Sequence, residues 1–284
     1  GEGSDEVFGG YDIFKEAKVR HFWARHPDSR LRPLLLMRLY PYLQVSPARA
    51  QSYLNIFFGQ AIDQPELPHF SHIPRWVTTA GCKELFSAEM KAAAETDPVE
   101  ALLSTLPPAF AGWHPFNRAQ YLECKSLLPG YLLSSQGDRM LMASSVEGRF
   151  PFLDHRVMEF AGRLHPDLKM KVLDEKYLLK RAAGHYLPRE IVRRPKQPYR
   201  APDIAAFFGD RTPDFVDELL SPKKISSFGY FDPGRISLLL KKIRHGRTIG
   251  NKDNMSLVGA LSTQCWHHLF VERYADAFRD SSVV

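Results

Sequence analysis

Apolar residues recur at intervals of three and four along most of the chain, which is the spacing of an amphipathic α-helix. Proline and glycine divide the pattern into segments, and we predict helices over residues 4–25, 31–60 (as one or two), 81–95, 97–105, 117–129, 137–147, 154–164, 174–186, 203–221, 233–245 and 252–276. Residues 150–153 are expected to be extended. The pattern predicts a mainly α protein, built as one helical unit with a soft boundary near residues 62–76.

Length and charge narrow the class of protein. With 284 residues, 44% of them hydrophobic, the chain can bury a sizeable core. It has no apolar run of the roughly 20 residues that span a membrane, so we expect no membrane partner and a cytoplasmic protein. The net charge of +6 comes from dispersed residues, so nucleic acid is not an expected partner. Three widely spaced cysteines favour neither a disulfide framework nor a zinc site.

The first eleven residues, Gly-Glu-Gly-Ser-Asp-Glu-Val-Phe-Gly-Gly-Tyr, combine glycines with acids. Gly1 and Gly3 allow a tight turn and a close approach of the backbone to a ligand, and Ser4 with Asp5 predicts a helix start. Three carboxylates lie within one turn: Glu2, Asp5 and Glu6. Since magnesium is commonly held by one or two carboxylates together with substrate phosphates, the segment favours a metal–polyphosphate site. The alternative is a capped surface helix with solvated acids.

A second block covers residues 138–155, Asp-Arg-Met-Leu-Met-Ala-Ser-Ser-Val-Glu-Gly-Arg-Phe-Pro-Phe-Leu-Asp-His. Met140 and Met142 are expected in the core, and Asp154 is expected to cap the next helix. Glu147 and Arg149 stand two residues apart, so on an extended chain their side chains point to the same side. We expect them to form either a buried ion pair or the wall of a pocket.

A third block runs from Glu175 to Tyr199 and contains Glu-Lys-Tyr-Leu-Leu-Lys, Leu-Pro and Arg-Pro-Lys-Gln-Pro. Five basic residues gather over positions 189–200 and are predicted to lie on a stiff extended loop instead of a helix face: Arg189, Arg193, Arg194, Lys196 and Arg200. Lys196 stands between two prolines, which lowers the entropy lost when its side chain is fixed on a phosphate. It is a candidate electrostatic catalyst.

The three blocks, in this order, resemble the synthetase domain of the glutamine-hydrolysing asparagine synthetase family. Its motifs run Ser-Gly-Glu-Gly-Ser-Asp-Glu-aliphatic-Phe-Gly-Gly-Tyr, then Asp-Arg-x-x-Met-Ala-x-x-x-Glu-x-Arg-x-Pro-Phe-Leu-Asp, then Lys-x-x-Leu-(Lys/Arg), Leu-Pro and Arg-x-Lys. Residues 1 to about 203 carry the resemblance. It implies the helical C-terminal portion of an α/β synthetase domain of the adenine-nucleotide-hydrolase-like class (PP-loop ATP pyrophosphatase).

The resemblance also implies a reaction. Such enzymes use ATP and Mg²⁺ to convert a carboxylate into an acyl-adenylate, release pyrophosphate, and let ammonia from glutamine displace AMP. Glu2 would then orient or deprotonate ammonia, and Lys196 would stabilise the phosphates. Glu147 and Arg149 would line the acceptor or ammonia side of the pocket. The residues implied to bind ATP or pyrophosphate are Gly1, Gly3, Ser4, Asp5, Arg194 and Lys196, and those implied to bind the metal are Asp5 and Glu6.

Two features of the family are missing from this chain: the Ser-Gly-Gly-x-Asp-Ser pyrophosphate loop and an N-terminal nucleophilic cysteine for glutamine hydrolysis. We therefore expect the chain to be the C-terminal part of a larger enzyme and incomplete alone. Its partners would be the upstream PP-loop and glutaminase segments of that enzyme. The oligomeric state stays open, a homodimer included.

The carboxylate acceptor is also open. Aspartate is the default, but relatives amidate other carboxylates in cell-wall and natural-product biosynthesis, or close a lactam or lasso ring. Glu2 argues against the β-lactam branch, which has a tyrosine there. Gly148, where the family often has a bulkier residue, predicts a larger pocket. A non-enzymatic alternative is an inactive helical interaction module.

Overall fold

The computed structural model describes residues 1–40, 47–197, 203–209, 211–246 and 250–274, with the side chains of 47–50 left out. These residues are mainly helical and contain no strand. The β contacts among them are two isolated bridges, between Phe86 and Phe231 and between Lys171 and Asp174. The described residues thus confirm the mainly α class.

Contacts divide the chain into two compact units. The described residues of Gly1–Pro74 and Thr105–Pro198 form unit 1, and those of Arg75–Ser104 and Tyr199–Val284 form unit 2. The chain first passes from unit 1 to unit 2 between Pro74 and Arg75, within the soft boundary predicted at 62–76. All three sequence blocks belong to unit 1 over their described residues.

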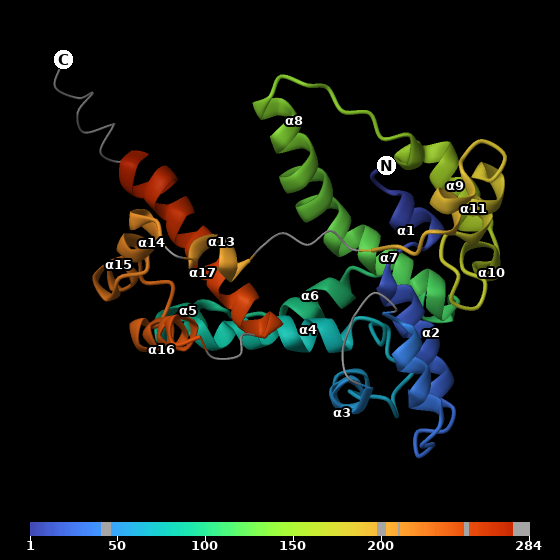
Figure 1. Cartoon of the computed structure of the whole chain (residues 1–284), viewed down its shortest axis with the longest axis horizontal. Helices are drawn as coiled ribbons and strands as arrows, with labels where there is room; N and C mark the ends of the chain where they lie inside the picture. The colour runs from blue at the N-terminus through green and yellow to red at the C-terminus, as the bar shows by residue number, and fades with distance from the viewer. Residues whose placement is uncertain (41–46, 198–202, 210, 247–249, 275–284) are drawn as a thin grey trace. The chain divides into compact units, whose positions relative to one another are not determined.

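The helices of unit 1 are short to medium in length, and some of them contact the amino-terminal helix directly (Figure 1). They are α1 (Ser4–Phe8), α2 (Asp12–Ala24), η1 (Arg32–Arg38), α3 (Pro47–Phe58), η3 (Pro108–Gly112), α7 (Pro115–Leu127), η4 (Leu128–Asp138), α8 (Arg139–Ala143), η5 (Pro151–Leu153), α9 (His155–Arg163), α10 (Pro166–Lys169), α11 (Tyr177–Ala183) and α12 (Arg189–Arg193). Helix α4 (Ile73–Ala80) crosses from unit 1 into unit 2.

The helix predicted over residues 4–25 is two helices. Gly9 adopts a left-handed conformation with φ of 71° and ends α1, since a residue without Cβ takes positive φ at little cost. Tyr11 is extended, and α2 begins at Asp12. The apolar periodicity continues through the break, so hydrophobic spacing alone did not reveal it.

The second block also differs from expectation. Segments α7, η4 and α8 follow one another as a single rod (Figure 1), with η4 wound as a π-helix. Met140 and Met142 are exposed at its end, at 59% and 77%, which corrects their assignment to the core. Residues 151–153 form a 3₁₀ turn instead of an extended run. Asp154 does cap α9, because its side chain accepts the Arg156 N–H.

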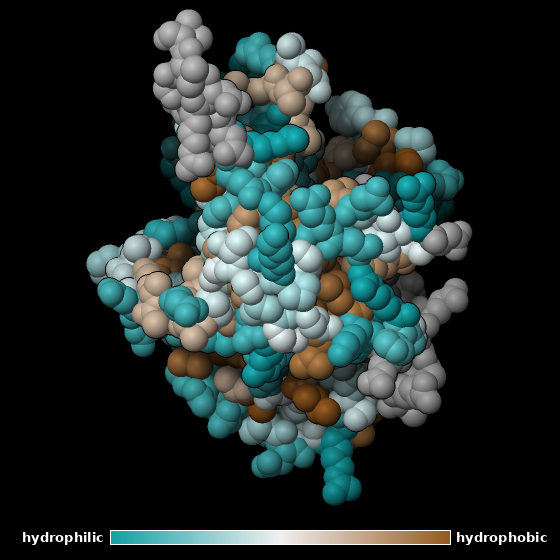
Figure 2. Space-filling model, turned by 90° about the vertical axis from the view of Figure 1, so that its left-hand side faces the viewer, coloured by the Kyte–Doolittle hydropathy of each residue, from teal (hydrophilic) through white to brown (hydrophobic). Residues whose placement is uncertain are grey.

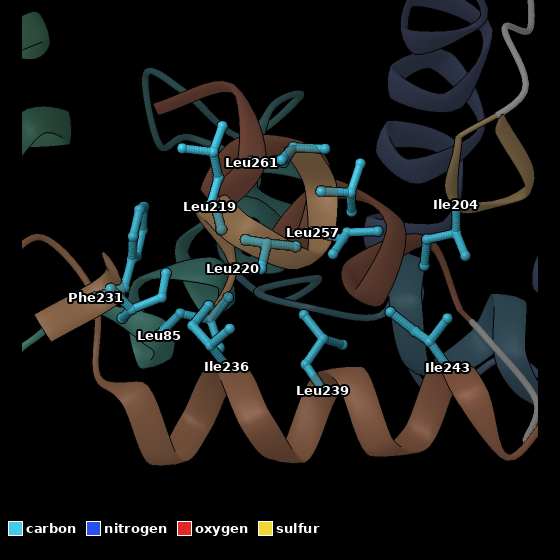
Figure 3. Packing of buried hydrophobic residues seen from close by; sticks show 13 residues of the cluster. Leu85, Ile204, Leu219, Leu220, Phe231, Ile236, Leu239, Ile243, Leu257 and Leu261 are labelled. Carbon is cyan, nitrogen blue, oxygen red and sulfur yellow. The ribbon is translucent and has the colours of Figure 1, made fainter. Parts of the chain in front are cut away.

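Unit 2 consists of short helices around a hydrophobic cluster. Its elements are η2 (Gly81–Leu85), α5 (Ala88–Ala93), α6 (Pro98–Ser104), α13 (Ile204–Phe207), α14 (Asp214–Leu219), α15 (Pro222–Phe228), α16 (Pro233–Arg244), α17 (Asn251–His267) and η6 (His268–Glu272). Helix α16 points Ile236, Leu239 and Ile243 toward Leu257 and its neighbours (Figure 3). The spacing of three and then four residues is the one expected for a buried helix face.

Hydrophobic side chains also reach the surface. On the face drawn in Figure 2 they lie as brown patches among hydrophilic residues, which is ordinary for a folded protein. Within the described ranges, no helix is long and apolar enough to cross a bilayer.

Candidate functional site

The three sequence blocks meet around α1. Val7 and Phe8 of α1 pack in one apolar cluster with Phe152 and Leu153 of the second block and Leu179 of the third. The rings of Phe8 and Phe152 lie 5.9 Å apart in an edge-on arrangement. A helix of five residues is not stable by itself, so this packing is what holds the acidic segment in place.

Two glycines of the first block are required by close approaches. Gly3 has a φ of 85°, and a Cβ at this position would collide with the side chain of Leu153. A Cβ on Gly10 would collide with Asp5 Oδ1 and with the side chain of Lys176. The glycines therefore let the backbone approach the second and third blocks, and no bound ligand is needed to explain them.

Asp5 is the centre of the charged group. Its Oδ1 lies 2.9 Å from Lys176 Nζ and its Oδ2 lies 3.2 Å from Lys196 Nζ. The three side chains are 13%, 20% and 31% exposed, in the order Asp5, Lys176, Lys196. They are shielded enough for weak solvent screening, yet still accessible to a ligand. Two cations facing one anion leave one surplus positive charge, which suits a phosphate.

Lys196 is tied to the cluster through its backbone as well. Its N–H donates to Glu175 Oε1 at 2.9 Å, and Glu175 Oε2 lies 2.8 Å from Lys15 Nζ of α2. Burial alone would raise the pKa of the Glu175 carboxyl. The hydrogen bonds from Lys15 and from the Lys196 N–H, together with the charge of Lys15, outweigh it and lower the pKa to about 2. Glu175 is therefore an anion at neutral pH.

Glu6 faces the interior, away from this role. It is 1% exposed and accepts a hydrogen bond from the Tyr11 hydroxyl at 2.7 Å. Burial raises the pKa of its carboxyl. Adjacent residues on a helix do not face the same point, so the structure does not bring Glu6 and Asp5 together as a pair of ligands. Asp5 is the acid of the first block that meets the lysines.

The other residues of the first block lie beside Asp5. Ser4 is buried, and its hydroxyl accepts a hydrogen bond from Lys176 Nζ at 3.2 Å. Gly1 is exposed and Glu2 is half-buried in the turn that precedes α1. Within the described part of the chain, Glu2 makes no hydrogen bond or ion pair, so its carboxylate is not committed to a structural contact.

Glu147 and Arg149 are paired but not buried. Arg149 Nη2 lies 2.6 Å from Glu147 Oε1, with side chains 81% and 74% exposed, so the expectation of a buried pair is corrected. Among the described residues, no hydrogen bond or ion pair joins them to Asp5 or the lysines. The space beside Gly148 is filled by Leu141 and Phe150, so Gly148 does not enlarge a pocket here.

The basic cluster is split by secondary structure. Arg189 and Arg193 are the first and last residues of α12, which corrects the prediction that they lie on an extended loop. Arg194 and Lys196 follow in extended chain. Arg194 is exposed, and no contact between described residues connects it to Asp5. Pro198, Tyr199 and Arg200 lie outside the described residues.

Sequence reasoning gave no role to Lys176, Glu175 or Lys15. Lys176 stood in the third motif, and that membership was the signal that could have singled it out. Its left-handed conformation, with φ of 51°, places it just before α11. Glu175 stands at the start of the third block, but its contact with the Lys196 N–H has no side-chain signal, and Lys15 lies outside all three blocks.

The donor set fits a metal-bound polyphosphate in part. A carboxylate is a hard oxygen ligand for Mg²⁺, and two ammonium groups with a hydroxyl suit phosphate oxygens. The residues on which this fit rests are Asp5, Ser4, Lys176 and Lys196. Such a group can stabilise charge that develops on phosphates during transfer.

Comparison with known proteins places this group in a family context. The amidase chyE of Penicillium rubens is 29% identical over 248 residues, which is 82% of this chain and 36% of the amidase. Asparagine synthetase (glutamine-hydrolyzing) 3 of Bacillus subtilis is 40% identical over 205 residues, 70% of this chain and 25% of that protein. A putative asparagine synthetase (glutamine-hydrolyzing) of Mycobacterium tuberculosis is 28% identical over 207 residues, 71% and 29% respectively.

The chain thus spans about a third or less of the length of these relatives. No solved structure matches it. The model of the asparagine synthase family matches residues 1–268, which takes in all three sequence blocks and their charged cluster. The chain belongs to the asparagine synthase family.

Proposed function

We propose that this chain supplies the phosphate side of a site that amidates a carboxylate at the expense of ATP. In this reaction the carboxylate attacks the α-phosphorus, an acyl-adenylate forms and pyrophosphate leaves. Ammonia, released from glutamine elsewhere in the enzyme, then attacks the acyl carbon, loses a proton and displaces AMP. The nucleotide-binding PP-loop, with the remainder of an α/β synthetase domain, would come from outside this segment.

One observation carries the proposal: Asp5, Lys176 and Lys196 come from distant parts of the sequence and meet within 3.2 Å. A purely structural surface would not need two half-buried lysines on one carboxylate, since isolated surface ion pairs contribute about 0 to 1 kcal/mol to stability. A charged phosphate ligand explains the surplus cation.

The roles follow from the chemistry of each group. Asp5 would bind Mg²⁺, which neutralises charge on the phosphates when bound. Lys196, joined by Lys176, would stabilise negative charge on the phosphate oxygens as the adenylate forms. Glu2, uncommitted among the described residues, would accept the proton that ammonia loses. Arg194 would contact phosphate, and Glu147 with Arg149 would line the acceptor side.

Aspartate is the first acceptor to test, because asparagine synthetases are among the matched relatives. The two fungal relatives named amidases give a reason to test other carboxylates too. A panel of carboxylates distinguishes between these acceptors.

The test is ATP–pyrophosphate exchange with Mg²⁺, measured on the whole protein as isolated, with aspartate and a panel of other carboxylates. Exchange that requires one carboxylate would establish adenylation and name the acceptor. Lys196→Ala should reduce exchange by about 100-fold or more, the size expected when one charge-stabilising group is lost from a transition state.

Lys125→Ala is the matched control. Lys125 is a lysine of α7 in the same unit, whose amine donates to the Thr105 carbonyl, so its removal changes net charge equally without touching Asp5. Exchange should stay at the wild-type rate. Equal losses in the two variants, or wild-type exchange in Lys196→Ala, would refute the role given to Lys196.

A further inference from the structure

Glu175 is a buried carboxylate with three donors from three different segments. Its side chain is 5% exposed. Lys15 of α2 approaches Oε2 at 2.8 Å, while Lys180 of α11 and the Lys196 N–H approach Oε1 at 3.1 Å and 2.9 Å. A carboxylate has about four lone-pair sites, so most of its capacity is used within the protein. Glu175 therefore has little capacity left to contact a substrate.

The contact with Lys196 differs in kind from the other two. Lys15 and Lys180 are side-chain cations that balance the buried charge. The Lys196 N–H is part of the backbone, in an extended stretch that follows α12. Among the described residues, this is the one hydrogen bond made by the backbone of Lys196. The lysine side chain starts from a backbone that Glu175 holds in place.

The same dipeptide places the second lysine. Lys176 follows Glu175 directly, and its amine reaches Asp5 Oδ1. The dipeptide therefore accounts for both cations that face Asp5. Lys176 supplies one of them with its own side chain, and Glu175 holds the backbone of Lys196, which supplies the other. A long lysine side chain has about 2 kcal/mol of rotamer entropy, so an anchored backbone reduces the number of positions its ammonium can reach.

We propose that Glu175 is a positioning residue that holds the backbone of Lys196 so that its ammonium group stays at Asp5. The inference rests on the proposed function for its catalytic consequence. The local contact itself can be tested without activity. Glu175 acts through Lys196 and touches no reacting atom.

The variant is designed to keep the fold. Removing Glu175 alone would take away the nearer carboxylate of the buried Lys15 and leave it only Asp12, at 3.7 Å, which is destabilising. The pair Lys15→Met with Glu175→Leu removes both charges and keeps the volume, an exchange that is often neutral for stability. Lys180 keeps Asp174 as a partner at 2.8 Å. Lys15→Met alone is the companion variant, because it leaves the acceptor of the Lys196 N–H in place.

The first readout is amide hydrogen exchange at Lys196 in the whole protein. In the pair variant we expect the Lys196 amide to exchange at least about tenfold faster, because without its hydrogen bond the local segment opens more often. The amides of α2 and α11 should keep their rates. In Lys15→Met its protection should remain. Unchanged protection of the Lys196 amide in the folded pair variant would overturn the proposal.

The second readout is a double-mutant cycle on pyrophosphate exchange. Residues that act as a unit are not additive, so Lys196→Ala should cost the wild type heavily but change the pair variant by less than about twofold. In these variants the loss of pyrophosphate-exchange activity should lower kcat more than it changes the KM for ATP. A full Lys196→Ala effect in the pair background would overturn the positioning role.

Asp174→Asn is the matched control. It removes the neighbouring carboxylate, which also contacts Lys180 but not the Lys196 backbone, so both readouts should match the wild type. A loss of protection at Lys196 in this variant would contradict the assignment to Glu175. Absence of pyrophosphate exchange in the wild-type protein with every carboxylate would reject the proposed function. Hydrogen exchange at the Lys196 amide would still decide whether Glu175 anchors Lys196.

Discussion

Glu175 and Glu6 are both buried glutamates, and their surroundings move their pKa in opposite directions. At Glu6 burial is the largest cause, and the pKa of the carboxyl rises from 4.5 despite the hydrogen bond from Tyr11. At Glu175 burial acts the same way, but the bonds from Lys15 and the Lys196 N–H reverse the outcome and lower the pKa to about 2. The hydrogen bonds and the charge of Lys15 outweigh burial at Glu175, whereas at Glu6 the neighbouring acids Asp5 and Glu123 add to its effect on the pKa.

This contrast predicts an acid dependence of stability. Because the folded-state pKa of Glu175 lies below its usual value of 4.5, its stabilisation is complete above pH 4.5 and is lost as pH falls toward 2. The pair Lys15→Met with Glu175→Leu should therefore lose less unfolding free energy than the wild type across this window. Denaturant unfolding at several pH values measures it.

The control for the acid dependence is Glu190→Gln, which removes an exposed carboxylate of α12. Its profile should be parallel to that of the wild type. A pair variant that loses stability with the same slope as the wild type between pH 4.5 and 2 would contradict the role of Glu175 as a buried anion.

At the scale of elements, α1 depends on its neighbours. It has five residues, no side-chain hydrogen bond at its N-cap, and a left-handed glycine at each end, Gly3 and Gly9. Its buried face meets η5, α9 and α11 through the apolar cluster around Val7 and Phe8. The position of Asp5 is therefore determined by hydrophobic packing of three segments, not by the helix itself.

Replacing Gly3 tests this dependence. Gly3→Ala places a Cβ against Leu153 on a backbone with φ of 85°, so both strain and collision oppose the native position. We expect a loss of about 1 to 3 kcal/mol in unfolding free energy, measured by urea denaturation. Gly112→Ala at the end of η3 meets open space and should change stability by less than about 0.5 kcal/mol. Similar losses in both variants would refute the explanation.

Sequence patterns predicted some of these elements and not others. The helical class was predicted, since periodicity carries that information, and the order of three motifs assigned Asp5 and Lys196 to one expected phosphate site without predicting their contact. The break at Gly9 was missed because apolar spacing continues across it. Glu6 was grouped with Asp5 because residues within one turn share a motif, although adjacent helical residues diverge. The anchoring of Lys196 by Glu175 uses a backbone donor, which no side-chain pattern reveals.

At the scale of the whole molecule, each unit has buried hydrophobic clusters of its own, and the candidate site belongs to one of them. Asp5, Glu175, Lys176 and Lys196 all lie in unit 1. The cluster in unit 2 includes Leu257, which is 1% exposed. We therefore expect mutations in the core of unit 2 to change stability without changing the charged site in unit 1.

Leu257→Ala tests this separation. Deleting a buried leucine should reduce the unfolding free energy of unit 2 by about 2 to 5 kcal/mol. Pyrophosphate exchange measured below the unfolding temperature should keep its KM and kcat. Leu238→Ala in the same unit, at a residue 65% exposed, should change stability by less than about 0.5 kcal/mol. Impaired exchange in folded Leu257→Ala would show that unit 2 contributes to the site.

The hydrogen bond between Lys196 and Asp5 joins residues 191 positions apart, and this separation has a consequence for biosynthesis. At translation rates of about 5 to 20 residues per second, the acidic segment leaves the ribosome roughly 10 to 40 s before its lysine partner. For most of that interval, until Lys176 and Leu179 have been synthesised, Asp5 has no cation from this block and the apolar face of α1 has no contact with Leu179. The site is thus completed late, after the helices between its two halves have been synthesised, and the amino-terminal segment depends on them for its structure.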